Sequence, residues 1–311
     1  MSAHTTFKIG GPAEAFVRPS DPESASGLLA AAKKAGIPLF VLGGGANILV
    51  GDKGIRGIVM ETSGLNSARV ERGEGRDILV AGAGLSIDEL CLGALAAGLG
   101  GLENFYGMPG TVGGAAFMNA RCYEREMSDV LAWVDSTDAQ GRITRRPVAP
   151  SGAVAATGAA ATGAAWAYKR SPYQSGATGV ESGEAAGELI LEAGFRLTRL
   201  TDEGAASAAA VMRRRRADRE AKGHYKLPSA GSVFKNDRSL GVPTGKLLDS
   251  LGLRGRRIGA AMVSPWHANI FVNEGGATAA DMRKLIELAQ REALERLGAK
   301  LECEVLMAGD F

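Results

Sequence analysis

Hydrophobic and polar residues alternate along the chain in runs that predict both helices and strands. Ser20, Asp21 and Pro22 are typical of a helix start, and the apolar pattern that follows them ends at Gly36. A short apolar run over residues 39–42 stops at three glycines and resumes over residues 48–50. The chain therefore begins with a predicted helix and two strands separated by a glycine turn.

Apolar residues at helix-like and strand-like spacings continue through the rest of the chain. Residues 78–81 predict a strand, and Ser86 is expected to cap a helix that ends near Gly98. Further strands are expected over residues 131–134, 189–195, 270–272 and 301–306, and helices over residues 201–222 and 278–297, the last of them stopped by Gly298. This mixture predicts an α+β (mixed α/β) fold.

Two glycine-rich segments are the first candidates for binding chemistry. Gly43, Gly44 and Gly45 would let backbone amides approach an anion, and a tight turn that needs positive φ is an equally good interpretation. Residues 107–115 combine four glycines with the rigid Pro109 and the hydroxyl of Thr111. Such a run can lie close to a flat, bulky cofactor, so a phosphate-bearing dinucleotide is expected on these segments.

The familiar nucleotide-binding motifs are excluded by their spacing. The Rossmann pattern needs glycine where the chain has Ile48, and again where it has Ile87. The segment from Gly241 to Lys246 misses the P-loop, because its first glycine is one residue too close and Leu247 replaces the hydroxyl residue.

Length and composition narrow the class of protein. A chain of 311 residues with 45% hydrophobic and 23% charged residues predicts two or three folded units rather than a disordered or fibrous protein. The 36 basic and 34 acidic residues nearly balance, so no chain-wide attraction to nucleic acid or anionic membrane is expected, and a small-molecule ligand is favoured. The three cysteines have no metal-type spacing, which predicts no metal site and a reducing cytoplasm.

Three further features are interpreted as structural. The start of the chain has no signal-peptide pattern, and no segment sustains about 18 apolar residues, so a cytoplasmic protein is expected. The alanine-rich segment 153–167 is interpreted as connecting sequence. The arginine run 213–216 is expected on a solvated helix face rather than in a binding site, and His267 is expected to be a packed histidine rather than a ligand.

Several motifs together resemble one enzyme family. The strings TTFKIGGPA, VLGGGANILVGDKGIRG, AGAG and GMPGTVGGAAFMNA are similar to the FAD-binding half of UDP-N-acetylenolpyruvoylglucosamine reductases, the MurB family. The more specific strings are SAGSVFKN at 229–236, HANIFVN at 267–273 and LECEV at 301–305. No obvious tyrosine-bearing insertion precedes SAGSVFKN, so the chain resembles the shorter type II members.

The resemblance implies a fold, a reaction and partners. It implies a two-lobed PCMH-type FAD-binding domain over residues 1–198, with lobes about 1–62 and 63–198. A smaller α+β substrate-binding domain over 199–311 would return its last strand to the active site. The implied enzyme binds FAD non-covalently and uses NADPH to reduce the enolpyruvyl ether of UDP-N-acetylglucosamine to UDP-N-acetylmuramate for peptidoglycan. It would be a cytoplasmic monomer with no nucleic acid or membrane partner.

The resemblance also assigns roles to residues. Cofactor contacts are expected from Leu42, Gly43, Gly44, Gly45, Ala46, Asn47, Ile48, Gly107, Pro109, Gly110, Thr111, Gly113 and Gly114. Ser232 would donate the proton that completes the product, although a serine beside Gly231 would otherwise be interpreted as a turn residue. Glu304 would support the enolate-like intermediate, either in protonated form or through water, and Glu302 would be a bystander.

The third catalytic position departs from the family pattern Tyr-Arg-x-Ser. Here the chain has Tyr168, Lys169, Arg170 and Ser171, so spacing assigns the arginine role to Lys169, and a shift of register would recruit Arg170 instead. Substrate contacts are expected from Tyr168, Lys235 and Asn236.

Two other functions remain open from the sequence. One is a flavin oxidase with the same FAD fold, which would consume oxygen without NADPH. The other is a nucleotide-binding sensor that keeps the glycine segments but does not turn over substrate.

Overall fold

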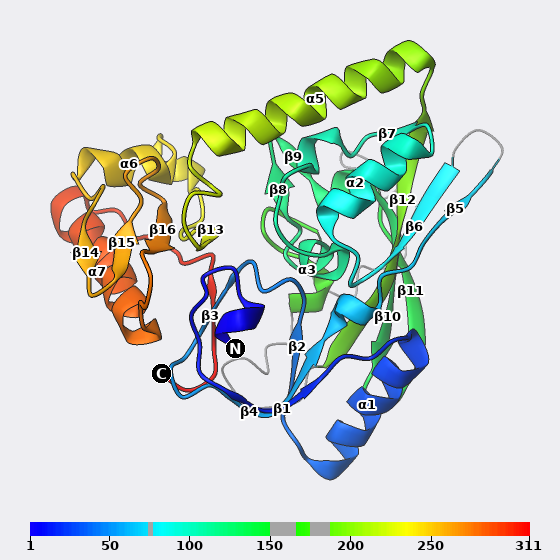
Figure 1. Ribbon diagram of the computed structural model, residues 1–311, viewed down its shortest axis with the longest axis horizontal. Coiled ribbons are helices and arrows are strands. Elements are labelled where there is room, and N and C mark those ends of the chain that lie inside the picture. The colour runs from blue at the N-terminus through cyan, green and yellow to red at the C-terminus, as the bar shows by residue number, and fades with distance from the viewer. Residues whose placement is uncertain (74–76, 150–165, 175–186) are drawn as a thin grey trace. The chain divides into compact units, whose positions relative to one another are not determined.

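Helices and strands are mixed throughout the described residues, which confirms the predicted α+β class (Figure 1). The computed structural model describes residues 1–73, 77–149, 166–174 and 187–311, and most of the alanine-rich segment 153–167 lies outside them. The described chain divides into two compact units, and each is considered by itself. The first unit comprises residues 1–14, 45–56 and 217–311, and the second comprises residues 15–44 and 57–216. These packing units do not test the family-based division after residue 198, which stays a prediction.

The second unit is built on an antiparallel sheet of strand order β11-β10-β12-β6-β5, with β7 paired to β12. The strands are β5 (Ala68–Glu71), β6 (Asp77–Gly82), β7 (Leu99–Gly100), β10 (Leu131–Asp138), β11 (Ile143–Pro147) and β12 (Glu188–Arg199). Its helices and short turns are α1 (Pro22–Ala35), η2 (Thr62–Gly64), α2 (Ile87–Ala96), η3 (Glu103–Phe105), α3 (Val112–Phe117), η4 (Met127–Asp129), η5 (Pro172–Gln174) and most of α5 (Asp202–Ala221).

Smaller pairings complete this unit. They are the hairpin of β8 (Arg121–Cys122) and β9 (Arg125–Glu126), and the parallel pair of β2 (Leu39–Leu42) and β4 (Ile55–Glu61), which β1 (Ala13–Val17) extends to the order β1-β4-β2.

A β-bulge in β12 lets this strand serve two cores. Leu189 and Leu191 are buried with α1, whereas Ala193 and Phe195 are buried with α2 and α3. Strict alternation would place odd-numbered residues on a single face, and the register shift opposite Asp135 and Ser136 breaks that alternation. The shift therefore allows helices to cover both faces of one strand.

The first unit is an antiparallel sheet of order β13-β16-β15-β14, and α6 and α7 share its core. Its elements are η1 (Ser2–His4), β3 (Ile48–Val50), β13 (Ser229–Ser232), η6 (Arg238–Leu240), α6 (Thr244–Ser250), β14 (Arg257–Ile258), β15 (Ala261–Val263), β16 (Ile270–Asn273), α7 (Ala279–Leu297) and β17 (Leu306–Ala308). Phe7 and Ile9, from the start of the chain, are buried in the same core. β17 pairs in parallel with β3, so the end of the chain completes a structure begun near residue 48.

Local capping residues fix several helix ends where the sequence predicts them. Asp21 caps α1, Ser86 and Thr278 form capping boxes on α2 and α7, and Gly36 and Gly298 end α1 and α7 in left-handed conformation.

The predicted strand over residues 301–306 is wrong. Residues 301–305 contain only an isolated bridge between Cys303 and Phe234, and the strand itself begins at Leu306. The apolar alternation of this segment reflects two different backbone partners, first residues 233–235 and then β3, rather than one continuous strand.

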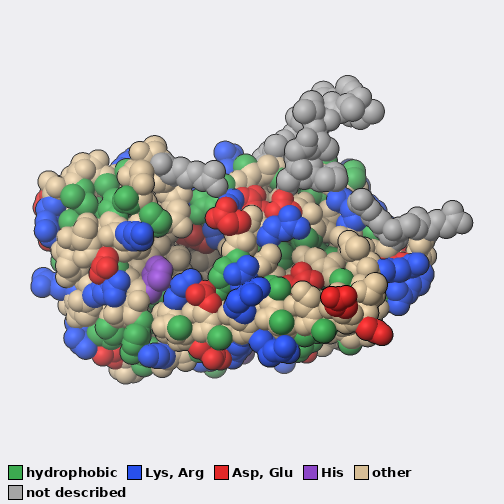
Figure 2. Space-filling view, turned by 90° about the horizontal axis from the view of Figure 1, so that it is seen from above, with side chains coloured by type: hydrophobic (Ala, Val, Ile, Leu, Met, Phe, Trp, Pro, Cys, Tyr) green, Lys and Arg blue, Asp and Glu red, His purple; other side chains and the backbone are tan. Residues whose placement is uncertain are grey.

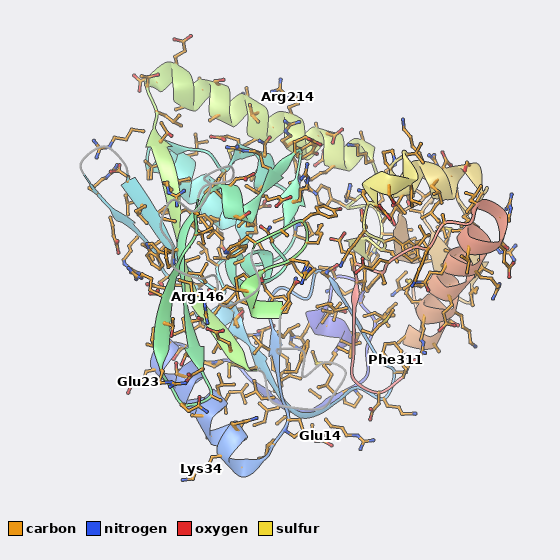
Figure 3. All side chains as sticks on the ribbon, turned by 180° about the vertical axis from the view of Figure 1, so that it is seen from behind. Glu14, Glu23, Lys34, Arg146, Arg214 and Phe311 are labelled. Carbon is orange, nitrogen blue, oxygen red and sulfur yellow. The ribbon has the colours of Figure 1, made fainter. Side chains whose placement is uncertain are left out.

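The arginine run 213–216 is only partly solvated. Arg213 and Arg214 are exposed on α5, where Figure 3 labels Arg214, but Arg215 stacks over the Tyr123 ring at 4.1 Å. Arg216 forms an ion pair with Asp88 at 3.6 Å. On the face seen in Figure 2, basic and acidic side chains are interspersed, in keeping with the near-zero net charge. Within the described ranges no helix has the length and hydropathy needed to cross a membrane.

Two histidines of the first unit lie close together, with ring centroids 6.4 Å apart. Burial, followed by the charge of Arg219, lowers the pKa of His224 to about 4, and burial also lowers the pKa of His267. The His267 Nδ1 atom accepts a hydrogen bond from the Asn269 amide at 3.2 Å, which requires that nitrogen to be unprotonated. The fold therefore favours both histidines in the neutral form.

We expect acid to destabilise the protein through His224. The pKa of His224 is near 6.5 in the unfolded chain and about 4 in the folded chain. The contribution of His224 to stability is therefore full above pH 6.5 and falls as the pH drops from 6.5 to about 4. Between pH 7 and pH 5 the loss from this residue is up to about 2 kcal/mol. Urea unfolding of wild type and His224→Gln at both pH values measures it. An equally large loss in the variant would contradict the role of His224.

Candidate active site

The two glycine-rich segments meet within the second unit. A Cβ atom on Gly43 would lie 2.8 Å from the Thr111 Oγ1 atom, and one on Gly44 would lie 2.8 Å from the Gly110 Cα atom. Neither Gly43 nor Gly44 has positive φ, so close approach, rather than turn geometry, restricts these two positions to glycine. The segments predicted to share one cofactor are thus brought together.

Backbone hydrogen bonds hold the second glycine-rich segment in place. The amides of Val112 and Gly113 donate to Leu85 and Ala83, at 2.9 and 2.8 Å, and Thr111 caps the short α3. A Cβ atom on Gly113 would lie 2.8 Å from that of Ala83, so this contact also excludes side chains.

The turn before α3 and the start of this helix contain the remaining residues predicted to contact the cofactor. Gly107 and Gly110 have positive φ, of 80° and 123°, and Pro109 between them is exposed. Gly114 donates its amide to the Thr111 hydroxyl at 3.4 Å. The Asp88 carboxylate accepts from the Gly107 amide at 2.6 Å, a contact the sequence did not predict because nothing in its pattern distinguishes Asp88 from an ordinary helix-start carboxylate.

The remainder of the first glycine segment lies in the first unit. Gly45 has φ of 60°, so the tight-turn interpretation holds for this glycine of the three. Its carbonyl accepts from the Thr6 amide at 3.0 Å, Ala46 follows in the turn, and Ile48 begins the buried strand β3. Leu42 ends β2 in the second unit and is 1% exposed. A packing role accounts for the Leu42 side chain.

The first unit also joins the segments that carry Ser232 and Glu304. Ser232 ends β13 opposite Ile270 and is partly buried. The carbonyl of the next residue, Val233, accepts a hydrogen bond from the Glu304 amide at 2.7 Å. Residues separated by more than seventy positions are therefore held at neighbouring points of the backbone.

Lys235 and Asn236 follow on the same segment. The Lys235 amide donates to the Glu302 carbonyl at 2.9 Å, and its Nζ atom pairs with the Glu302 carboxylate at 2.6 Å. Asn236 is exposed, and its Oδ1 atom accepts from the Thr244 amide at 2.9 Å. Glu302, expected to be a bystander, is thus the partner of a predicted substrate-binding lysine. Its 73% exposed side chain makes this a weak ion pair that another anion can displace.

Cys303, between the two glutamates, is not a candidate nucleophile. Burial raises the pKa of its thiol to about 11, and its Sγ atom donates to the Val305 carbonyl at 3.3 Å. The thiol is therefore protonated near neutral pH.

Tyr168 and Lys169 form the tip of a tight turn in the second unit. Ala167 and Arg170 exchange two backbone hydrogen bonds, at 3.1 and 2.9 Å, and Lys169 has φ of 55°. A non-glycine residue pays about 1 kcal/mol for this conformation. Arg121 lies 5.8 Å from the Tyr168 ring centroid, and Arg170 is exposed. The fold therefore forces the Lys169 backbone into an unusual conformation at one predicted catalytic position.

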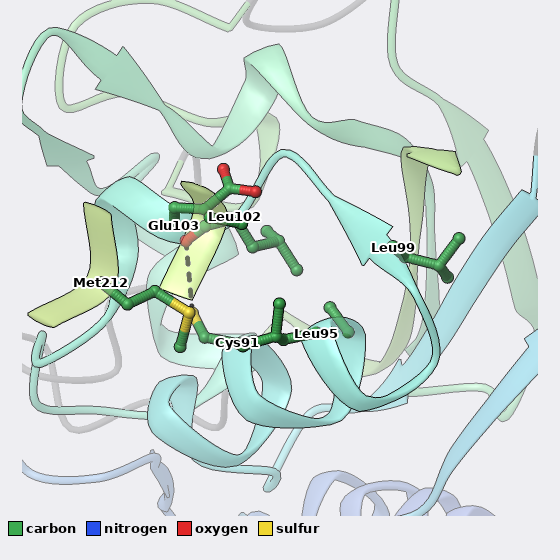
Figure 4. Close-up of a pocket in the computed structure, with 8 residues that line it drawn as sticks. Cys91, Leu95, Leu99, Leu102, Glu103 and Met212 are labelled. Carbon is green, nitrogen blue, oxygen red and sulfur yellow. Dashed lines mark hydrogen bonds between the residues drawn. The ribbon is translucent and has the colours of Figure 1, made fainter. Parts of the chain in front are cut away.

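A small hollow elsewhere in the second unit is unrelated to these residues. Figure 4 shows Cys91, Leu95, Leu102, Glu103 and Met212 around it. The Cys91 thiol donates to the Leu102 carbonyl at 3.3 Å, and burial raises its pKa. None of the predicted site residues lines this hollow.

Comparison with known proteins identifies the family. Residues 223–308 match the profile described as the C-terminal domain of UDP-N-acetylenolpyruvoylglucosamine reductase, and residues 13–146 match that of an FAD binding domain. The UDP-N-acetylenolpyruvoylglucosamine reductase of Treponema denticola is 40% identical over 99% of this chain and 91% of its own length. The chain belongs to this reductase family.

Other relatives agree with this assignment. The reductase of the same name from Treponema pallidum is 36% identical over the whole chain and 92% of its own length. The crystal structure of UDP-N-acetylenolpyruvylglucosamine reductase from Thermus caldophilus is 29% identical, with a TM-score of 0.73 over 99% of this chain and 96% of that one. The family resemblance inferred from the motifs is confirmed.

The cofactor of this family is FAD, and the glycine segments fit it. Backbone at Gly43, Gly44 and Gly113 carries no side chain where a Cβ atom would already meet its neighbours. Bare backbone of this kind lets amide groups reach phosphate oxygens, and Thr111 adds a hydroxyl at the same place. Which individual residues touch FAD stays a prediction.

We expect Gly44→Ala to lower FAD retention at least about tenfold, because the added methyl group would meet backbone rather than a movable side chain. The flavin-to-protein absorbance ratio and FAD titration measure the effect. The matched control is Gly27→Ala in the interior of α1, where no atom lies within 4 Å of the new Cβ. That substitution should raise stability by about 0.5–1 kcal/mol and leave FAD binding unchanged. Normal FAD affinity in Gly44→Ala would contradict the expectation that FAD binding depends on the close approach at Gly44.

Proposed function

We propose that this protein reduces UDP-N-acetylglucosamine enolpyruvate to UDP-N-acetylmuramate, with NADPH as reductant and FAD as cofactor. The observation that carries this proposal is the hydrogen bond from the Glu304 amide to Val233, the residue after Ser232. It holds the Glu304 backbone beside the segment that carries Ser232, in a chain 40% identical to a reductase of that name. The product is a peptidoglycan precursor.

Ser232 supplies the proton in this proposal. Bound FAD would carry hydride from NADPH to the methylene carbon of the substrate, which leaves an electron pair on the adjacent carbon. Ser232 gives its hydroxyl proton to that carbon and is reprotonated from solvent. Serine is a weak acid, but an enolate carbon is a strong base, so position matters more than the pKa of the donor.

Glu304 stabilises the developing charge beside the substrate carboxylate, as a hydrogen-bond donor or through water. Its backbone is held at both ends of the residue, by Val233 and by the side chain of Asn47. A side chain on backbone fixed in this way needs little reorganisation during the reaction.

Cationic and amide groups bind the nucleotide. Lys235 and Asn236 would contact the diphosphate, which would displace Glu302 from Lys235. Tyr168 would contact substrate, and Lys169 would face its carboxylate with a point charge rather than the planar fork of arginine.

The protein would act in the cytoplasm as a monomer on this small molecule, without nucleic acid or membrane as partner. The oxidase and sensor alternatives are not favoured, since the relatives that match nearly the whole chain are reductases.

Anaerobic mixing tests the proposed reaction directly. NADPH should bleach the bound flavin, and the enolpyruvyl nucleotide should then restore its absorbance while UDP-N-acetylmuramate forms. Bleaching without restoration by this nucleotide would overturn the proposal. Oxygen consumption with an alcohol or lactone in the absence of NADPH would support the oxidase instead.

Ser232→Ala separates the two steps. Bleaching by NADPH should stay near the wild-type rate, whereas restoration by the nucleotide should slow at least about a hundredfold, the scale for loss of a positioned acid. Ser229→Ala, at the other end of β13, is the matched control and should change neither rate more than about twofold. Equal slowing of both steps in Ser232→Ala would contradict the proton-donor role.

Lys169→Asn tests the strained turn. Asparagine tolerates positive φ better than lysine, so the melting temperature should not fall, but loss of the positive charge should lower kcat/KM for the nucleotide at least about tenfold. Arg170→Gln is the comparison at the neighbouring residue and should change kcat/KM less than threefold. The reverse pattern would assign the arginine role to Arg170.

A further inference from the structure

Asn47 is linked to Glu304 across almost the whole length of the chain. The Asn47 Nδ2 atom donates to the Glu304 carbonyl at 3.0 Å, over a separation of 257 residues. The Asn47 carbonyl accepts from the Leu306 amide at 3.0 Å. One residue of the glycine segment therefore bonds to the backbone on both sides of Val305.

Glu304 has no regular secondary structure of its own to fix it. It lies between the isolated bridge at Cys303 and the start of β17 at Leu306. Its amide is held by Val233 at 2.7 Å and its carbonyl by Asn47 at 3.0 Å. Those two hydrogen bonds occupy both backbone groups of Glu304.

The hydrogen bond from the Asn47 side chain is not needed to pair β3 with β17. β3 and β17 already pair through Ile48 and Leu306, so the sheet register is set without the Asn47 side chain. Main-chain pairing begins one residue beyond Val305 and leaves the Glu304 carbonyl to a side-chain donor. The Asn47 side chain holds the Glu304 carbonyl, which the strand pairing does not reach.

We propose that Asn47 is a positioning residue for Glu304 and that it acts in this way on the step that consumes the nucleotide, in addition to its expected contact with FAD. The inference rests on the proposed function, because Glu304 is taken as the residue that stabilises the intermediate. Loss of the donor would let Glu304 move, and a displacement of about 1 Å in a positioned group can slow a reaction about a hundredfold.

Two substitutions remove the donor in different ways. Asn47→Ala deletes the amide, and Asn47→Asp keeps the shape but places a carboxylate oxygen opposite the Glu304 carbonyl. The matched control is Gln290→Ala, because the Gln290 Nε2 atom donates to the Leu301 carbonyl at 3.1 Å, only three residues before Glu304. Both hydrogen bonds, the one from Asn47 and the one from Gln290, join a side-chain amide to the same C-terminal segment.

Half-reactions of the FAD-bound enzymes are the first readout. Because Asn47 is also an expected cofactor contact, both half-reactions are measured at saturating FAD. In both Asn47 variants we expect the rate of bleaching by NADPH within about twofold of wild type, with restoration by the nucleotide slowed at least about tenfold. Gln290→Ala should leave the ratio of the two rates unchanged. Glu304→Gln combined with Asn47→Ala should be no slower in restoration than Glu304→Gln alone, because Asn47 acts through Glu304.

Hydrogen–deuterium exchange gives a second readout that does not depend on turnover. Peptides covering residues 302–308 should exchange faster in both Asn47 variants than in wild type and Gln290→Ala. Unchanged exchange would overturn the inference, as would equal slowing of both half-reactions at saturating FAD, or multiplicative slowing in the double variant. If wild type fails to recolour with the nucleotide while exchange responds as expected, the proposed reaction is wrong and the positioning by Asn47 stands.

Discussion

The parallel pairing of β3 with β17 is the constraint on which the first unit depends. Leu306, Met307 and Ala308 run beside Ile48, Leu49 and Val50, so the end of the chain is held against a strand near its beginning. Closing so long a loop is entropically costly, but the cost grows only slowly with length, and the cluster that buries Leu49 with Phe234 and Val305 offsets it. Once this pairing forms, Glu304 lies two residues before the paired strand, and its bonds to Val233 and Asn47 then fix its backbone.

The second unit depends on a different constraint, which is close packing around glycine backbone. Gly43 and Gly44 lie against Thr111 and Gly110 with no room for a Cβ atom, and Gly113 does the same against Ala83. Hydrogen bonds from α3 and its turn to residues 83 and 85 keep these surfaces in register. Glycine is needed at Gly45 for a different reason, since its φ is positive. The three adjacent glycines thus meet two separate physical requirements, and the tight-turn interpretation made from the sequence holds for Gly45.

Local chemistry explains which predictions succeed. The ends of α1, α2 and α7 follow from side chains within one turn, such as Asp21, Ser86 and Thr278, so the sequence alone suffices. The strand predicted at residues 301–306 fails because its course is decided by Val233 and β3, which no periodicity in that segment can reveal. The ion pair of Lys235 with Glu302 and the bond from Asn47 to Glu304 are hidden for the same reason, since each joins residues far apart in sequence. The reaction was predicted from the resemblance of the motifs to a known family, because neither a serine beside glycine nor alternating glutamates is specific for this chemistry.

Physical requirements within the segment Gly43–Asn47 can therefore be separated residue by residue. Gly43 and Gly44 keep backbone bare, Gly45 reverses the chain, and the Asn47 side chain reaches the Glu304 carbonyl. A methyl group added at Gly44 acts on the close approach to Gly110, whereas loss of the Asn47 amide acts on a carbonyl 257 residues away. Because these effects fall on different groups, cofactor binding and the proposed reduction of the nucleotide need not fail together when this segment changes. In the proposed function, this short glycine-rich segment serves both the cofactor and Glu304, the residue that would stabilise the intermediate.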